Sequence, residues 1–360
     1  MALDRIGLAN FRNHADTLLT GTAQFNLLIG ENGAGKTNVL EAISLLSPGR
    51  GLRHVGLAEM SAQRGPGGFA VSADLAASGT AIRLGTGVMA DHPRRRLVQI
   101  EGAEAPVMRL AEWLSIGWLT PAMDRLFAEG ASARRRFVDR MAMALTPGHA
   151  RNATRLEASL RERNRLLAEP AEPDPAWLDA VEQQVAEAGS LVALARQALI
   201  AGLGEALAAL PEAPFARPLL AYQPGGPIEG AALAAALKAS RPRDRAAQRT
   251  TIGPHRDELA VTMSGKGQPA ALASTGEQKA MLIAITLAHA GLLGTERPQL
   301  LLLDEVAAHL DPLRRGALFD RLREGAAQVW LTGTELAPFA GIAAEAAVWR
   351  VSGGAVERLS

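Results

Sequence analysis

Eight residues near the N-terminus constrain the fold of this chain more than any others. Gly30–Thr37 reads G-E-N-G-A-G-K-T and fits the pattern G-x-x-x-x-G-K-[S/T], whose glycines let backbone N–H groups surround phosphates. An apolar strand is predicted before it, at 23–29, and apolar residues recur with helical spacing at 37–46. A helix that starts at such a turn attracts anions. We therefore predict a nucleotide-binding α/β fold, in which Lys36 contacts the β- and γ-phosphates as a catalytic residue and the Thr37 hydroxyl binds Mg²⁺.

A second cluster of polar residues follows an apolar segment near the C-terminus. Leu300–Leu303 is predicted to be a buried strand, and Asp304 and Glu305 come directly after it. In an open α/β sheet, ligands bind at the carboxyl ends of the strands, which is where these two carboxylates are expected. We predict that Asp304 holds Mg²⁺ and that Glu305 is the catalytic residue that orients or activates the attacking water.

Composition narrows the class of protein further. The 38 Lys and Arg residues nearly offset 37 Asp and Glu, so a nucleic-acid surface must be a local patch. The absence of Cys excludes disulfides, a thiol nucleophile and zinc–cysteine clusters, and it fits a cytoplasmic location. No secretory signal or membrane span is expected, because the apolar run around 300–303 is far shorter than the roughly 20 residues that a span needs. Lysine occupies only four of the basic positions, which makes Lys36 conspicuous.

Local patterns predict two α/β segments separated by helices. Short strand-like runs at 65–105 suggest an antiparallel sheet, and strands alternating with helices after 250 imply a parallel one. Helices at 132–167 and 177–210, joined by a proline-rich turn, favour a helical hairpin. The first carries nine Arg against three acidic residues and the second one Arg against four, and these opposite charges fit that pairing. The predicted domains are 1–125 for the N-terminal part of an ATPase head, 126–245 for an inserted helical arm and 246–360 for the C-terminal part of the head.

Several shorter elements are also expected. After Pro211 the pattern is that of a loop, followed by a short Ala-rich helix that precedes Arg241–Arg245. Further along the chain, the predicted strands are 259–263, 299–303 and 328–332, and the predicted helices are 277–293 and 313–325.

The segment Ser274–Lys279, S-T-G-E-Q-K, distinguishes between kinds of nucleotide-binding fold. By itself it fits the capped start of a helix. Together with the phosphate loop, the leucine strand with its two carboxylates and A-H-L-D at 308–311, it resembles the ATP-binding-cassette heads of the Rad50 and SMC class. The resemblance implies an α/β head with a mixed sheet, in which Ser274 and Gly276 bind the γ-phosphate held by a second subunit. It also places Asp311 in the loop that crosses the dimer interface.

Five blocks occur in order along nearly the whole chain: Asn10–His14, Gly30–Ala42, Arg134–Asp139, Gly253–Asp257 and Ser274–Lys279. In these blocks the chain resembles the RecF family of bacterial recombination-repair proteins. The resemblance implies an ATP-dependent homodimer that binds duplex DNA or a single-strand/duplex junction and hydrolyses ATP weakly. RecR and RecO are the implied partners, and the implied role is to load RecA at gaps and stalled forks and to assist the SOS response.

The resemblance also implies a set of nucleotide contacts, with ATP and Mg²⁺ as cofactors. These contacts are Gly30, Glu31, Asn32, Gly33, Ala34, Gly35, Lys36, Thr37, Asn38 and Arg12, with Ser274, Gly276 and Asp311 acting across the dimer and Thr37 and Asp304 as metal ligands. A salt bridge is an equally good role for Arg12. Related heads often place a histidine after the last core strand, but Val329–Thr334 has none, so slow hydrolysis is expected. Gln63 and Gln99 are candidates for the Q-loop glutamine without a supporting pattern.

Clustered arginines are the candidates for DNA phosphate contacts, if they share one surface, although each fits a solvated charge as well. They are Arg50, Arg53, Arg94–Arg96 and Arg134–Arg136. His255 and Arg256 fit the nucleotide, the DNA or a structural role. Aromatic residues make up only 4% of the chain, which favours contacts to the DNA backbone over base stacking.

Two alternative functions remain open at this point. One is an ATPase that serves a membrane transporter, which the basic helical arm does not suit. The other is an SMC- or Rad50-like signalling or structural ATPase that does not act in gap repair.

Overall fold

The computed structural model describes residues 2–62, 65–77, 80–146, 148–171, 173–211, 213–294 and 296–360. It divides into two compact units. The head unit is formed by Met1–Met123 and Thr286–Ser360, and the arm unit by Asp124–Ile285. Residues 246–285, which were expected with the head, lie in the arm unit, because β10 in this segment pairs with β9 of the arm.

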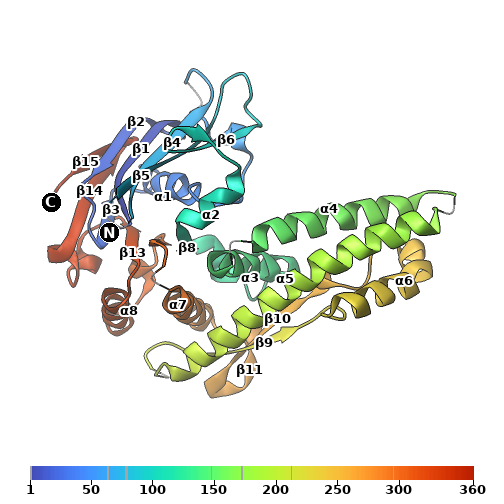
Figure 1. The fold of residues 1–360 in the computed structure, drawn as a ribbon. Helices are drawn as coiled ribbons and strands as arrows, with labels where there is room; N and C mark the ends of the chain where they lie inside the picture. The colour runs from blue at the N-terminus through green and yellow to red at the C-terminus, as the bar shows by residue number, and fades with distance from the viewer. Residues whose placement is uncertain are drawn as a thin grey trace. The chain divides into compact units, whose positions relative to one another are not determined.

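The head unit is built around a six-stranded sheet of order β15-β14-β3-β13-β12-β8, shown in Figure 1. All neighbouring strands are parallel except β14 and β15. The strands are β3 (Phe25–Ile29), β8 (Ser115–Leu119), β12 (Gln299–Leu303), β13 (Gln328–Gly333), β14 (Ala346–Ser352) and β15 (Ala355–Arg358). The predicted strands at 23–29, 299–303 and 328–332 are confirmed, whereas β8, β14 and β15 have no counterpart among the predictions.

A second sheet of the head unit is antiparallel, with the order β2-β1-β4-β5-β6-β7. Its strands are β1 (Leu3–Phe11), β2 (His14–Thr20), β4 (Phe69–Ala77), β5 (Thr80–Val88), β6 (Arg96–Ile100) and β7 (Ala103–Glu104). This confirms the antiparallel sheet that was predicted at 65–105. The helices α1 (Lys36–Ser44), α2 (Leu110–Trp113) and α8 (Pro312–Glu324) also belong to this unit. Apolar side chains of β1, α1, β12 and β14 share one core, which fixes α1 beside the strands that end at the site.

The arm unit combines long helices with a small antiparallel sheet of order β11-β10-β9. Its elements are α3 (Ala131–Leu145), α4 (His149–Ala168), α5 (Pro175–Ala209), β9 (Pro218–Gln223), α6 (Gly230–Ala247), β10 (Glu258–Met263) and β11 (Gln268–Pro269). The predicted hairpin is confirmed by α4 and α5, which run side by side in Figure 1. Its first arm, predicted as one helix at 132–167, consists of two helices instead, because α3 ends at Leu145 and α4 starts at His149. The strand β9 lies where a loop was expected. Helix α7 (Thr275–Leu292) starts in the arm unit and ends in the head unit.

Helix α5 is, among the described residues, the one helix long and apolar enough to be considered a membrane span, with a mean hydropathy of 1.5. This helix was not expected to be a candidate span, because charged residues interrupt its apolar sequence. Val185 and Val192 of α5 are fully buried in the core of the arm unit. The buried side chains of Glu182 and Arg196 interrupt its apolar surface, and both are ion-paired within the unit. Packing in the arm therefore accounts for the buried face of α5, whereas Leu191 and Leu194 on the same helix are each 49% exposed.

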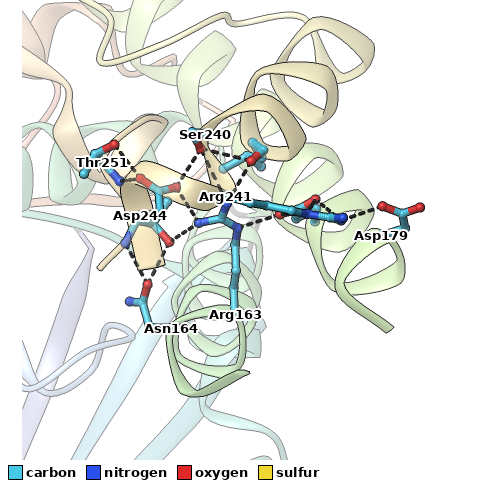
Figure 2. A network of polar contacts seen from close by, with 10 residues as sticks. Arg163, Asn164, Asp179, Ser240, Arg241, Asp244 and Thr251 are labelled. Carbon is cyan, nitrogen blue, oxygen red and sulfur yellow. Dashed lines mark hydrogen bonds and ion pairs between the residues drawn. The ribbon is translucent and has the colours of Figure 1, made fainter. Parts of the chain in front are cut away.

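A buried arginine joins the three long helices at the end of the arm, as Figure 2 shows. The Arg163 side chain of α4 is fully buried, and its Nε lies 3.0 Å from Glu182 Oε1 of α5. Its Nη1 donates to Asp244 Oδ2 of α6 at 2.7 Å and to Thr250 Oγ1 at 2.8 Å, and its Nη2 donates to the Leu237 carbonyl at 2.9 Å. Each N–H direction of the guanidinium therefore meets an oxygen, which is what a buried charge requires.

The same network corrects one prediction. Helix α6 does not end before Arg241–Arg245 but continues through this segment, with Pro242 inside the helix. A proline there removes one backbone donor. Asp244 is fully buried, and bonds from Ser240, Arg163 and Thr251 hold its carboxylate, so the tertiary contacts keep the last turns helical.

Candidate functional site

The phosphate-loop motif lies between β3 and α1, as predicted, and its glycines occupy positions that other residues fit poorly. Gly33 and Gly35 have φ angles of 81° and 117°, in the left-handed region that favours glycine. At Gly30 an added Cβ would come within 2.1 Å of the Val351 carbonyl oxygen. The loop therefore passes close to β14, and a conformational or steric reason favours glycine at each of its three glycine positions, two of which belong to the pattern.

The loop presents free donors at the start of α1. The N–H groups of Gly33, Gly35, Lys36 and Thr37 donate to no acceptor in the described part of the chain. The Lys36 ammonium turns back onto the loop and donates to the Gly30 and Glu31 carbonyls at 2.6 and 2.8 Å. Burial of Lys36 lowers its pKa, which the nearby Glu305 and Asp304 partly counteract. Free amides, a helix N-terminus and a cation in one place fit the phosphates of a nucleotide.

The carboxylate of Asp304 faces the same loop. Its Oδ1 and Oδ2 accept from the Thr37 hydroxyl at 2.9 and 3.1 Å, and Oδ1 also accepts from the Thr332 hydroxyl at 2.8 Å. Burial raises the pKa of Asp304, whereas the bonds from Thr332 and Thr37 lower it. Mg²⁺ prefers oxygen ligands and is commonly held by one or two carboxylates together with substrate phosphates. The residues Thr37 and Asp304 are oxygen donors side by side and fit this ion.

Glu305 follows Asp304 in an unusual backbone conformation. Its φ angle is 53°, and its N–H donates to the Thr332 hydroxyl at 2.9 Å. Thr332 belongs to β13, is fully buried and bonds both residues at the end of β12. In the sequence, the only site feature noted for this segment was its lack of a histidine. The structure shows Thr332 holding the two carboxylate residues, a role that depends on the pairing of β12 with β13.

The Arg12 guanidinium is engaged in bonds within the head unit, and none of these bonds goes to the phosphate loop. Its Nε and Nη2 form a double contact with the buried carboxylate of Glu41 on α1, at 2.9 and 2.8 Å, and its Nη1 donates to the Glu59 carbonyl at 2.9 Å. Arg53 reaches the same Glu41 at 2.9 Å and also bonds the amide oxygen of Asn38. The arrangement matches the salt bridge considered for Arg12. Glu41 was not among the predicted site residues, because a glutamate within a helix gives no signal in the sequence of being buried.

The motif residues outside the loop lie at helix starts. Ser274 directly precedes α7, and its hydroxyl donates to Oε2 of Glu277, in the first turn of α7, at 2.9 Å. The Lys266 ammonium donates to Oε1 of the same carboxylate at 2.6 Å. The bonds from Lys266 and Ser274 lower the pKa of Glu277 to about 2. Gly276 is in the first turn of α7, and Asp311 caps α8 by accepting from the Arg314 N–H at 2.9 Å. Ser274 and Gly276 belong to the arm unit, and the phosphate loop and Asp311 to the head unit.

Two of the family-like blocks meet inside the arm unit. Arg135 donates to the Asp257 carbonyl at 2.9 Å. Arg196 of α5 bridges the blocks, because its guanidinium bonds Asp139 and Asp257 at 2.8 Å each. The ion pairs and bonds hold the pKa of Asp139 down to about 2 despite burial. His255 bonds the Thr250 carbonyl at 2.9 Å, which is the structural role considered for it.

Most candidate DNA-binding arginines already have protein partners. The partners of Arg53 are given above, Arg95 pairs with Glu104, and Arg134 pairs with Glu258. Arg96 donates to carbonyls at the end of α1, including that of Gly49 at 2.6 Å, and burial lowers its pKa to about 10. Four candidate arginines are exposed and have no such partner within the described ranges: Arg50, Arg94, Arg136 and Arg256. Gln99 is exposed on β6, and Gln63 lies outside the described residues.

Comparisons with known proteins agree with this geometry. Residues 2–344 match the model of the RecF/RecN/SMC N terminal domain. The chain is 42% identical to the DNA replication and repair protein RecF of Rhizobium rhizogenes, over 99% of this chain and 98% of the relative. It is 43% identical to the protein of the same name from Brucella suis, over 98% of this chain and 95% of the relative.

Solved structures show the same fold. A structure of the recombination mediator protein RecF-ATP in the RecFOR pathway superposes with a TM-score of 0.86 at 22% identity, covering 100% of this chain and 98% of that one. A Smc head domain from Pyrococcus furiosus gives a TM-score of 0.56 at 15% identity, covering 99% and 96%. The predicted α/β fold of an ABC-type, SMC-like ATPase head with a helical insertion is therefore confirmed.

Proposed function

Because the chain belongs to the RecF family of DNA replication and repair proteins, we propose that it is an ATP-dependent DNA-binding protein of recombinational repair. The single observation that carries the proposal is the junction of Thr37, Asp304 and Thr332 beside the free amides at the start of α1. It combines a phosphate cradle with oxygen donors for Mg²⁺. RecF-ATP is also the subject of a solved structure with the same fold.

We propose the following roles for residues of this chain in binding and hydrolysing ATP. The free amides of Gly33 and Gly35–Thr37 and the Lys36 ammonium bind the phosphates, and the remaining residues of Gly30–Thr37 with Asn38 complete the nucleotide site. Thr37 and Asp304 would hold Mg²⁺, which would supply charge neutralisation to the phosphates. The Glu305 carboxylate orients or activates the attacking water. In this proposal Arg12 acts indirectly, by fixing Glu41 of α1.

We further propose that ATP joins two copies of the chain. Ser274 and Gly276 of one copy would complete the nucleotide site of the other, and Asp311 would lie at their interface. Ser274 and Gly276 lie at the start of α7, and a helix N-terminus favours an anion such as the γ-phosphate, which supports their proposed role. Asp311 lies at the start of α8. Turnover is expected to be weak, with ATP serving mainly as the switch for dimerisation.

DNA is the proposed partner, as duplex or as a single-strand/duplex junction, with exposed arginines meeting the phosphates. RecR and RecO are the expected protein partners, since a solved structure with this fold is described within the RecFOR pathway. Recombinase loading at gaps and stalled forks, and assistance to the SOS response, complete the proposal. These processes place the protein in the cytoplasm.

The decisive experiment uses Glu305→Gln, which keeps the size of the side chain and removes its basicity. With ATP, this variant is expected to accumulate as a dimer that retains DNA, measured by light scattering and by DNA retention. Glu335→Gln, at an exposed position two residues beyond β13, is the matched control and is expected to behave as wild type. Two results together would refute the proposed ATP-dependent, DNA-binding dimer: a Glu305→Gln variant that stays monomeric, and an ATP turnover of the wild type that DNA does not change. They would favour a transporter-type or structural ATPase.

A further inference from the structure

The outer side of the phosphate loop rests on the turn between β1 and β2. Asn13 Nδ2 donates to the Ala34 carbonyl at 2.9 Å, and His14 Nε2 donates to the Gly35 carbonyl at 3.1 Å. A second donor, the N–H of Gly354, reaches the Ala34 carbonyl at 3.0 Å. Both consecutive carbonyls of the loop are therefore held from the side of this turn.

The contact between turn and loop is close enough to exclude a side chain on the loop. A Cβ at Gly35 would lie 2.7 Å from Asn13 Nδ2 and 2.8 Å from His14 Nε2. On the other side, a Cβ at Gly354 would lie 1.9 Å from the Asn13 carbonyl oxygen. Asn13 is therefore flanked by two glycine positions of the backbone, although the residue is exposed, and the bonds of its amide give it a defined direction.

Both side chains are themselves oriented by further bonds. The Asn13 amide oxygen accepts from Asn38 Nδ2 at 2.7 Å. His14 is fully buried, and its Nδ1 lies 3.0 Å from the Thr17 hydroxyl, which in turn bonds the Gly354 carbonyl at 3.2 Å. The turn, the start of α1 and the β14–β15 connection form one hydrogen-bonded assembly behind the loop.

The direction of these carbonyls determines the direction of the amides. A trans peptide places its C=O and its N–H on opposite sides. Holding the Ala34 carbonyl against Asn13 therefore turns the Gly35 N–H away from the turn, and holding the Gly35 carbonyl against His14 does the same for the Lys36 N–H. These two N–H groups are among those that have no acceptor in the described chain.

We propose that Asn13 and His14 are positioning residues for the nucleotide, which fix the peptides Ala34–Gly35 and Gly35–Lys36 with their N–H groups directed at the phosphate. Neither side chain touches the phosphate in this assignment. They act by removing the cost of ordering the loop when a polyphosphate binds, which is how preorganisation raises affinity. The inference rests on the proposed ATP site, and it adds two residues from outside the loop to it.

The test compares ATP and ADP affinity of purified full-length variants, measured by titration calorimetry. Asn13→Ala is at an exposed position and removes one of the two donors to the Ala34 carbonyl, so a folded variant is expected. His14→Leu removes the side-chain donor to the Gly35 carbonyl, which keeps its bonds from the N–H groups of Asn38 and Val39 in the first turn of α1. His14→Gln returns an amide donor to the place of Nε2. We expect the dissociation constants of both nucleotides to rise about five- to tenfold in Asn13→Ala and His14→Leu, the usual effect of one lost hydrogen bond. His14→Gln is expected to recover most of the loss.

A second readout separates positioning from general stability. Amide hydrogen exchange of Gly33–Lys36, in the absence of nucleotide, is expected to accelerate in Asn13→Ala and His14→Leu. Leu19→Ala, a cavity variant at a buried position of β2, is the control that lowers the melting temperature but leaves affinity and loop exchange unchanged. Wild-type affinity and exchange in Asn13→Ala and His14→Leu would overturn the inference. Failure of the wild-type protein to bind ATP would instead overturn the proposed function.

Discussion

At the scale of single residues, Thr332 has a role that no motif describes. Its hydroxyl donates to the carboxylate of Asp304 and accepts the N–H of Glu305, whose backbone is in the left-handed region. A non-glycine residue with such a φ angle needs surrounding structure to hold it. One buried hydroxyl therefore fixes both the carboxylate expected to bind Mg²⁺ and the residue expected to act on water.

Replacing Thr332 by Val keeps the shape of the side chain and removes both bonds. The variant loses one of the two bonds that lower the pKa of Asp304, so this pKa is expected to rise above its already raised value. A protonated carboxyl does not bind Mg²⁺. As the pH is lowered, the variant is therefore expected to lose Mg²⁺-dependent ATP binding at a higher pH than the wild type does. Turnover is expected to drop by about 10- to 100-fold, as for other residues that orient a metal ligand.

The measurement is the Mg²⁺ concentration for half-maximal ATP turnover between about pH 5 and pH 8, the range in which folded proteins are commonly most stable. Thr334→Val, at an exposed position on the same chain segment, is the control. Identical Mg²⁺ requirements in Thr332→Val and wild type would show that the hydroxyl does not tune Asp304.

At the scale of elements, the arm is held together by charges as well as by apolar packing. Arg163 joins α4 to α5 and α6, and Arg196 joins α5 to the segments around Asp139 and Asp257. Burying several ions costs free energy that only complete pairing offsets. The arginine-rich composition of 132–167 therefore serves, at Arg163, the interior of the arm and not its surface.

Arg163→Met tests this role. The substitution leaves Asp244 fully buried without its cation and Glu182 with Arg241 alone, so the free energy of unfolding is expected to fall by about 3–5 kcal/mol. Urea denaturation followed by circular dichroism measures the change. Arg161→Met, whose side chain is 71% exposed and lies 3.8 Å from Glu157, is the control and is expected to stay within about 1 kcal/mol of wild type. An unchanged Arg163→Met would mean that the network is not stabilising.

At the scale of the whole molecule, the near-zero net charge conceals where free positive charge remains. Arg53, Arg95, Arg96, Arg134 and Arg135 are engaged with protein oxygens. Arg50 and Arg94 are exposed, and both flank the contact in which Arg96 bonds the Gly49 carbonyl of the head unit. If this part of the head meets DNA, Arg50 and Arg94 are the residues available for phosphates.

The double variant Arg50→Ala/Arg94→Ala is therefore expected to bind duplex DNA more weakly in the presence of ATP. The loss should be similar for all sequences, and each lost phosphate contact should reduce the slope of log affinity against log salt by about 1. Fluorescence anisotropy over a range of salt concentrations measures both effects. Arg95→Ala, at an exposed arginine paired with Glu104, is the matched control. A wild-type salt slope in the double variant would place the DNA surface elsewhere.

Local sequence patterns were sufficient for the parts of the molecule whose chemistry is local. The glycines of 30–35, the four leucines before Asp304 and the proline break between α4 and α5 each act on their own backbone, so the loop, β12 and the hairpin were predicted from neighbours alone. The strands β8, β9, β14 and β15 were missed. The strands β8, β9 and β14 pair with partners distant in the chain, such as β3 for β14 and β10 for β9. The strand β15 pairs with its neighbour β14 across Gly353 and Gly354, and this local hairpin was overlooked.

The sequence by itself determined that this chain is built around a phosphate loop and two carboxylates at a strand end, because those residue types at that spacing suit little else. Only the tertiary structure decided how its charges are used. Whether Arg12, Arg96 or Arg163 meets solvent or a buried oxygen depends on Glu41, on the end of α1 and on Asp244, which the fold brings to them from elsewhere in the chain. The physical reason is that the desolvation and the pairing of a charge depend on its surroundings in space, and the residues adjacent in the sequence do not determine these surroundings.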